Sequence, residues 1–238
     1  MKFDAEFILK SQILMPMNNV RISRRQPEVT EKSSVSPRKK PIQCRSQMTL
    51  TALQKAFVQV LVERGYDKMT IREVAAVAGV GVGTMYDYVP NLRALAASTI
   101  HKNCVEYADI LKSKAKETSG QPIGIVVNTL LTTLIELGFA RPREWTALLL
   151  LERQVSSPEA LRKIHEAFVD IWAEAFRASS TVIPTAKIIP VARMAHAISY
   201  GWYSHDLLFY NDAPLHSRSM EEIGYAIIGF VHSSPLQH

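Results

Sequence analysis

The sequence has few of the features that mark secreted or membrane proteins. It contains only two cysteines in 238 residues, Cys44 and Cys104, and they form no CxxC pair. Two distant thiols are typical of a protein in a reducing cytosol rather than of a disulfide scaffold. Polar residues interrupt each apolar run well before the roughly 18 residues that a transmembrane helix needs. The N-terminus has no clean apolar stretch of the kind found in signal peptides. We therefore predict a cytoplasmic protein with no membrane partner.

Motifs of catalysis and metal binding are also missing. The sequence has no GxSxG, no HExxH, no phosphate-binding glycine loop and no clustered carboxylate pair. His101 and Cys104 lie three residues apart on a predicted helix, but no further ligand is nearby, so a packed or solvated pair is the better interpretation. We expect no enzyme activity, no catalytic residue, no metal site and no cofactor.

A capped helix begins at Thr70. Ile71, Val74 and Ala75 share one face at i, i+3, i+4 spacing, which predicts a short helix over residues 71–78. Thr70 is a favoured N-cap residue, and Glu73 three positions later completes a capping box.

A second short helix is predicted directly after a glycine turn. Gly79 provides the backbone freedom needed to leave the first helix sharply. The second helix is predicted over residues 81–88, and Pro90 prevents it from continuing. Two helices in this arrangement form a helix-turn-helix, which lays its second helix in the DNA major groove.

The stretch from about Met48 to Tyr107 resembles the DNA-binding domain of the tetracycline-repressor (TetR) family of bacterial regulators. The residues that carry the resemblance are Ala52, Ala56, Phe57, Leu61, Arg64-Gly65-Tyr66-Asp67, Met69-Thr70-Ile71, Val74-Ala75, Ala78-Gly79-Val80, Gly83-Thr84-Met85-Tyr86-Asp87-Tyr88 and Pro90-Asn91. The resemblance implies an all-α chain with a three-helix DNA-binding domain over residues 47–107, whose helix-turn-helix spans about 70–89. A helical ligand-binding and dimerisation domain of about six helices would follow over residues 108–238.

The resemblance also implies which side chains contact DNA. We expect the interface to contain Thr70, Gly81, Val82, Gly83, Thr84, Tyr86 and Tyr88. Val82 would face DNA, where an apolar side chain can touch a thymine methyl group, and Met85 would face the core.

Three positions depart from the family pattern. Gly81 stands where a capping Ser or Thr is usual, which costs only a few tenths of a kcal/mol. Leu92 stands where a phosphate-binding Lys is usual, and Val89 where Phe is common. The first two leave open an alternative, a TetR-like small-molecule sensor with weakened DNA binding.

Positive charge is concentrated before the predicted DNA-binding domain. The chain has a net charge of +6, and the residues up to 47 account for the whole excess. The segment from about Arg21 to Ser46 is rich in Ser, Pro, Gln and charge, so we expect residues 1–46 to be a disordered basic arm. Its candidate DNA contacts are Arg38, Lys39, Lys40 and Arg45. A solvated tail, or a true start at Met17 or Met48, remains open.

Helices punctuated by Pro, Gly and Ser are predicted for the rest of the chain. The expected ranges are 92–116, 123–137 with its exit at Gly138, 143–155, 158–178, 186–209, and a last helix to about residue 231. Ser219 and Glu222 are predicted to form a capping box for this last helix.

In the resembled family, the last two helices pair with a second subunit, and the other helices surround a small-molecule pocket. We expect Ile223, Ile227 and Phe230 to form a homodimer interface, with packing inside one subunit as the alternative. Ligand-binding residues stay unassigned; the candidates are Tyr107, Phe139, Trp145, Phe168, Trp172, Phe176, Met194, Trp202 and Tyr203, with the polar Arg193, His196 and His205. Together these features predict a regulator, most simply a repressor, that a small-molecule inducer of unknown identity releases from a palindromic operator in double-stranded DNA.

Overall fold

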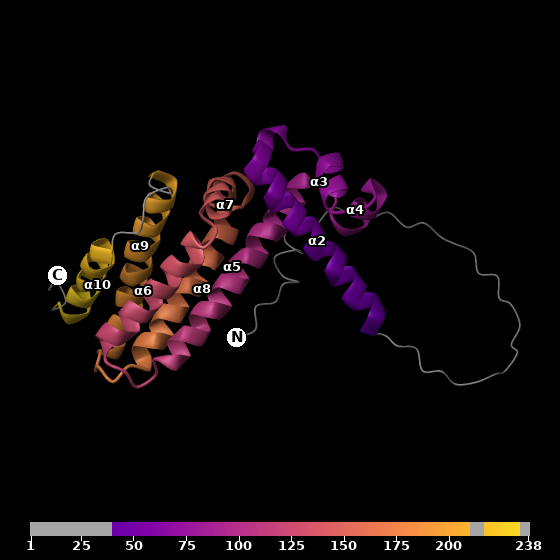
Figure 1. The fold of residues 1–238 in the computed structure, drawn as a ribbon. Helices are drawn as coiled ribbons and strands as arrows, with labels where there is room; N and C mark the ends of the chain where they lie inside the picture. Colours follow the sequence, from indigo (N-terminus) through magenta and orange to yellow (C-terminus); the bar gives the residue numbers. More distant parts are fainter. Residues whose placement is uncertain (1–39, 210–216, 234–238) are drawn as a thin grey trace, which may run out of the picture. The chain divides into compact units, whose positions relative to one another are not determined.

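The computed structural model describes residues 40–209 and 217–233. Within these ranges the chain forms nine α-helices, α2 to α10, one short 3-10 helix and no strand (Figure 1). The predicted all-α class is therefore confirmed for the part of the chain that is described. The chain divides into two units between Ser46 and Gln47, and the second contains both apolar cores found among the described residues.

The first helices form the predicted three-helix domain, here called the head domain. They are α2 (Lys40–Arg64), the 3-10 helix η1 (Tyr66–Lys68), α3 (Ile71–Val77) and α4 (Val82–Tyr88). Phe57, Leu53, Val74 and Met85 are almost fully buried between them. The prediction of disorder up to residue 46 is wrong in its last part, because α2 already begins at Lys40.

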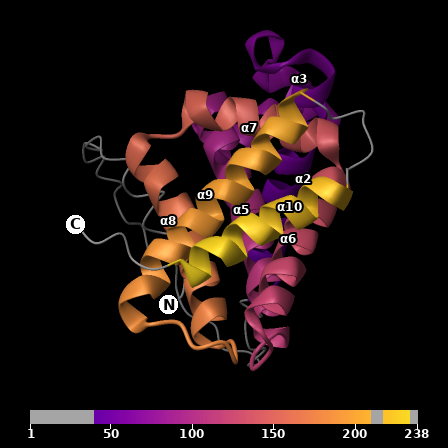
Figure 2. The same cartoon turned by 90° about the vertical axis from the view of Figure 1, so that its left-hand side faces the viewer.

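Six further helices form what we call the rear domain. They are α5 (Leu92–Glu117), α6 (Ile123–Phe139), α7 (Pro142–Val155), α8 (Pro158–Arg177), α9 (Thr185–Phe209) and α10 (Ser217–His232). Side-chain caps set two of their starts: Asn91 accepts a hydrogen bond from the backbone N of Ala94 at 2.8 Å, and Ser157 accepts one from Ala160 at 3.2 Å. The last helix, α10, packs across α6 and α9 (Figure 2).

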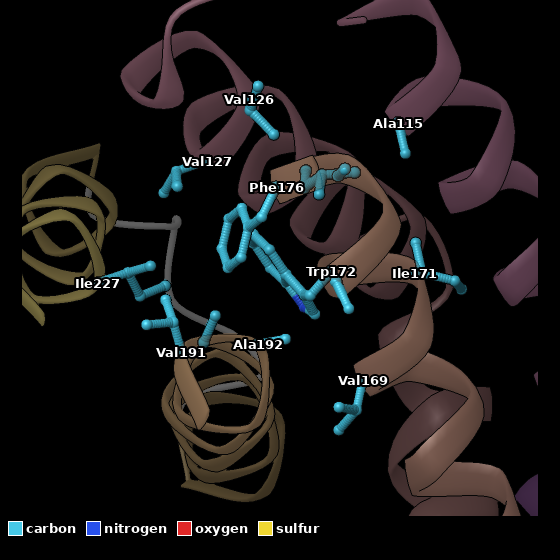
Figure 3. Packing of buried hydrophobic residues seen from close by; sticks show 14 of the residues in the cluster. Ala115, Val126, Val127, Val169, Ile171, Trp172, Phe176, Val191, Ala192 and Ile227 are labelled. Carbon is cyan, nitrogen blue, oxygen red and sulfur yellow. The ribbon is translucent and has the colours of Figure 1, made fainter. Parts of the chain in front are cut away.

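The core of the rear domain is built around α8. Trp172 and Phe176 point from α8 between the helices that surround it, towards Val127 of α6 and Val191 of α9 (Figure 3). Ile227 of α10 reaches the same core and is 1% exposed. Burying such large apolar side chains provides roughly 1.5–3 kcal/mol each, which fixes the register of these four helices.

Two predicted helix boundaries are wrong. Gly138 does not end its helix, because α6 runs on to Phe139. The predicted capping box at Ser219 and Glu222 is also wrong, since α10 begins at Ser217 and position 219 lies inside it.

Taken singly, none of the helices in the described residues is long and apolar enough to cross a membrane. Only α6 and α7 taken together meet that criterion by length and composition, and they are bent by 96° at the break between them.

Candidate nucleic-acid interface and ligand cavity

The start of α3 has the capping box that the sequence predicts. The Thr70 hydroxyl oxygen accepts a hydrogen bond from the backbone N of Glu73 at 3.3 Å, and the backbone N of Thr70 donates to the Glu73 carboxylate at 3.0 Å. Arg64 forms an ion pair with the other Glu73 oxygen at 2.9 Å. The hydrogen bonds from Thr70, and to a lesser degree the charge of Arg64, lower the pKa of Glu73. The end of α2 is therefore tied to the start of α3.

A glycine turn then sets the direction of the second helix. Gly79 adopts a φ of +70°, a left-handed conformation that favours glycine. The backbone N of Val80 donates to the carbonyl of Ala75 at 3.0 Å, which closes the turn. The second helix, α4, starts after Gly81, which makes no side-chain capping bond.

The exposed face of α4 carries most of the predicted DNA contacts. Gly81, Gly83, Thr84 and Tyr86 are exposed, and Tyr86 leaves 53% of its surface open. Met85, on the opposite face, is fully buried as predicted. Thr70 is also exposed, although its hydroxyl already contacts Glu73.

Val82 and Tyr88 are less accessible to DNA than predicted. Both are half-buried and pack against the head-domain core, so neither side chain is wholly available to DNA. Leu92 packs against the same core and is half-buried, which explains why an apolar residue is tolerated where the family has Lys.

Arg38 and Lys39 of the predicted arm lie outside the described residues. Lys40 and Arg45 belong to the first turns of α2 and therefore to a helix instead of an extended arm, with their side chains outside the described set.

Five helices of the rear domain, α5 to α9, line a cavity of about 80 Å³. Three of them contribute residues at i, i+3, i+4 and i+7, so that one face of each helix points inwards. With four residues of α8 and Leu134 of α6, the wall consists of Ile100, Asn103, Cys104, Tyr107, Leu134, Trp145, Leu148, Leu149, Glu152, Ile164, His165, Phe168, Trp172, His196, Ser199, Tyr200 and Tyr203.

Two histidines form a hydrogen-bonded pair in this wall. Nδ1 of His165 on α8 lies 2.9 Å from Nε2 of His196 on α9. The Tyr200 ring meets His165 edge-on at 4.7 Å between centroids, and Phe168 stacks on His196 at 5.7 Å. Burial lowers the pKa of His196 to about 4, with a smaller contribution from His165. Burial also lowers the pKa of His165, so at neutral pH the pair carries no charge.

Other polar groups of the wall are buried with few partners. Tyr107 donates its hydroxyl hydrogen to the carbonyl of Leu134, whereas the Tyr203 hydroxyl is buried with no hydrogen-bond partner in the described part of the chain. Glu152 is 7% exposed, and burial raises the pKa of its carboxyl group. Burial and the nearby Glu152 raise the pKa of Cys104 to about 12, so this thiol stays protonated.

The cavity and the head domain share structural elements. Ile100 of α5 and Leu148 of α7 line the cavity and also belong to the apolar cluster that forms the head-domain core. Leu151 and Val155 extend this cluster along α7. At the end of α7 the Val155 carbonyl accepts a hydrogen bond at 3.4 Å from Arg93, near the start of α5. The cavity wall and the head-domain core therefore have two side chains in common.

Part of the cavity could be recognised from the sequence. Tyr107, Trp145, Phe168, Trp172 and Tyr203 were candidates and line it, as does His196. The remaining candidates, Phe139, Phe176, Met194, Trp202, Arg193 and His205, do not line it. Glu152, His165 and Tyr200 were missed, and only their periodicity with Trp145, Phe168 and His196 could have indicated them.

The predicted dimer residues lie on two faces of α10. Ile223 and Ile227 are 8% and 1% exposed because they pack against the core of their own chain. Their assignment to a dimer interface is therefore wrong, and the alternative of packing inside one subunit holds for them. Phe230 is 37% exposed and Tyr225 71%, so the apolar surface left uncovered lies on the other face.

Comparison with known proteins agrees with this geometry. Residues 55–98 match the family model of bacterial regulatory proteins, tetR family. A TetR family transcription regulator from Marinobacter aquaeolei VT8 has the same fold, with 14% identity, a TM-score of 0.62, and coverage of 79% of this chain and 98% of that one. The fatty acid degradation regulator FadR from Bacillus halodurans is 16% identical with a TM-score of 0.60, over 80% of this chain and 97% of that one. FadR from Bacillus subtilis, solved in complex with stearoyl-CoA, is 16% identical with a TM-score of 0.56, over 76% and 97%.

The search of curated proteins gave no significant match. A helix-turn-helix head on a helical rear domain is the architecture of a DNA-binding transcriptional regulator. The match to the tetR family model covers the helix-turn-helix head, and the fold of the chain is shared with solved TetR-family transcription regulators.

Proposed function

We propose that this protein is a ligand-responsive repressor. A small molecule bound in the cavity of the rear domain would release the head domain from its operator. The observation that carries this proposal is the sharing of Ile100 and Leu148 between the cavity wall and the head-domain core. A ligand that moves either side chain favours one arrangement of the head over another, and DNA affinity changes by the difference in ligand affinity for the two states.

The DNA-binding surface in this proposal is the exposed face of α4. Thr84 and Tyr86 contact base edges or phosphates, Gly81 and Gly83 let the helix approach closely, and Thr70 stands at the adjoining end of α3. Lys40 and Arg45 on α2, with Arg38 and Lys39 before it, are proposed to contact the phosphate backbone.

A homodimer is part of the proposal. The exposed apolar residues of α9 and α10 are its proposed interface: Met194, Leu208, Phe209, Tyr225 and Phe230. Apolar side chains gathered on two adjacent helices are unfavourable in water and favourable against a second copy. Two heads related by a two-fold axis would read a palindromic operator with half-sites about one DNA turn apart.

Selection of genomic DNA fragments by the purified protein tests this function. We expect enrichment of one inverted-repeat sequence, bound in gel-shift titrations with a steep salt dependence. A reporter driven from a promoter that overlaps this sequence should rise when the regulator gene is deleted. Failure to enrich any sequence would instead support the small-molecule sensor with weakened DNA binding, which the uncapped Gly81 and the apolar Leu92 favour.

A further inference from the structure

We propose that the cavity binds a compact lipophilic cation, an aromatic or aliphatic amine or quaternary ammonium, with Glu152 as its counter-charge. This inference rests on the proposed function, because it names the class of ligand for the cavity assigned there to the inducer. The charges of the wall, its aromatic rings and the position of Glu152 each support it.

The cavity wall contains an acidic residue and no basic one apart from histidine. Among the residues that line the cavity, Glu152 is the only acid, and none is Lys or Arg. The two histidines are held neutral by burial, as their lowered pKa values indicate. Arg153, which is exposed and does not line the cavity, acts electrostatically on Glu152, His165 and Tyr200 from outside the wall. Within the wall itself, a carboxylate, phosphate or coenzyme A group would therefore meet no positive side chain and one acidic one. The stearoyl-CoA bound by the Bacillus subtilis neighbour is an anion and does not suit this wall.

The Glu152 carboxylate makes no hydrogen bond or ion pair with any residue in the described ranges, and Glu152 is 7% exposed. The one positive charge that acts on it is that of Arg153, the exposed residue that follows it on α7. Burial outweighs this charge and raises the pKa of the carboxyl group, because a buried carboxylate is costly to ionise. A bound cation in direct contact with Glu152 would make its ionisation favourable. The place of Glu152 at i+7 from Trp145 and i+4 from Leu148 directs the carboxylate to the inner face of α7.

Aromatic rings surround the same space. Six Phe, Tyr and Trp rings line the cavity: Tyr107, Trp145, Phe168, Trp172, Tyr200 and Tyr203. Tyr107 meets Trp145 edge-on at 5.0 Å and Phe168 at 6.1 Å, so the rings form a connected cage. The faces of such rings attract cations, and this is the usual way in which proteins bind quaternary ammonium groups.

The size of the cavity favours a compact ligand. At about 80 Å³ it is far smaller than the pockets of 300 Å³ or more that hold drug-sized molecules. A larger ligand has to displace side chains of the wall, and Leu148 and Ile100 are those that lead to the head domain. The unpartnered Tyr203 hydroxyl offers one further polar contact to the ligand.

A pair of isosteric probes tests the class of ligand. Benzyltrimethylammonium and neopentylbenzene have the same shape, with a charged nitrogen in the first and a carbon in the second. Binding to the full-length protein at pH 8, measured by the fluorescence of Trp145 and Trp172, should favour the cation by at least about tenfold. The anion 4-tert-butylbenzoate should bind more weakly than either probe.

Variants of two glutamates make the test specific. Glu152→Gln should remove most of the preference for the cation, whereas Glu166→Gln, an exposed acid on α8 outside the cavity wall, should leave it unchanged. Equal affinity for both probes, no binding of the cation at millimolar concentration, or a preference kept by Glu152→Gln would each overturn the inference. Release of the operator by a neutral or anionic ligand would overturn it too, while sustaining the proposed repressor. Cation binding without any effect on DNA affinity would sustain the cation site and overturn the proposed repressor.

Discussion

The ring of Tyr203 on α9 lies directly against the backbone of Gly138 on α6. A Cβ atom at position 138 would overlap Cε2, Cζ and the hydroxyl oxygen of Tyr203. Only glycine lets this ring reach the cavity wall, where it stands 6.4 Å from Tyr107 between ring centroids. The glycine that looked like a helix exit is therefore a point of close approach between two helices.

Gly138→Ala should destabilise the protein. The added methyl group forces the Tyr203 ring to move, at a cost of typically 1–3 kcal/mol, and the better helix propensity of Ala offsets up to about 1 kcal/mol. We expect a net loss of roughly 1 kcal/mol or more in urea unfolding. Gly124→Ala on the same helix, where the new Cβ makes only ordinary contact with Ile228, is the control and should not destabilise. If the loss persists in a Tyr203→Leu background, the overlap is not its cause.

The sequence predicted the helix-turn-helix because its determinants are local. The capping box of Thr70 and Glu73, the left-handed Gly79 and the stop at Pro90 act within a few residues, so no distant contact is needed to recognise them. The rear helices were also predictable in number and approximate range, because their caps and breakers are local as well.

The cavity could not be assigned in the same way. Tyr107, Trp145 and Phe176 each lie on the apolar face of a different helix, yet the first two line the cavity and Phe176 is 1% exposed in the solid core. The difference depends on which helix faces each side chain, and that is set by the packing of helices distant in sequence. The same applies to α10, where contact with α6 and α9 determined that Ile227 faces inwards and Tyr225 outwards.

The half-buried histidine pair, His165 and His196, should make stability depend on pH. The pKa of His196 is lowered to about 4 from an ordinary value of 6.5, so the unfolded chain binds the proton more readily. Stability is then fully present above pH 6.5 and is lost as pH falls towards 4, by up to about 3 kcal/mol. Urea unfolding between pH 7.5 and 4.5 measures this slope. His196→Gln should flatten it and His205→Gln, at an exposed position on the same helix, should not. Equal slopes for wild type and His196→Gln would contradict the assignment.

Substitutions at two adjacent residues of α4, Met85 and Tyr86, should affect folding and DNA binding separately. Tyr86→Ala is expected to weaken operator binding by about 1–3 kcal/mol with little change in melting temperature, because its side chain is 53% exposed. Met85→Ala is expected to lower unfolding free energy by about 2–5 kcal/mol, because its side chain is fully buried. Gel-shift titration and circular dichroism measure the two effects. Unchanged operator affinity in Tyr86→Ala would show that α4 does not read DNA.

Leu92→Lys should restore the phosphate contact that the family pattern contains. The position is half-buried, so the stem of Lys can pack where Leu does while its ammonium group reaches solvent. The slope of log affinity against log salt concentration should steepen by about 0.9, the value for one extra phosphate. Leu92→Gln, of similar reach and without charge, is the control. A slope equal to that of wild type would mean that this side chain points into the protein.

The exposed apolar face of α10 should determine the oligomeric state. Phe230→Glu and Tyr225→Glu place a charge on surface that is already open to water, so each should dissociate the proposed dimer while the monomer stays folded. Ile227→Glu should instead unfold the chain, because it buries a charge in the core of a single subunit. Analytical ultracentrifugation and circular dichroism distinguish the two outcomes. The folded monomers should bind an operator half-site weakly and lose the affinity gained from two linked sites. A Phe230→Glu, Tyr225→Glu double variant that still sediments as a dimer would place the interface elsewhere.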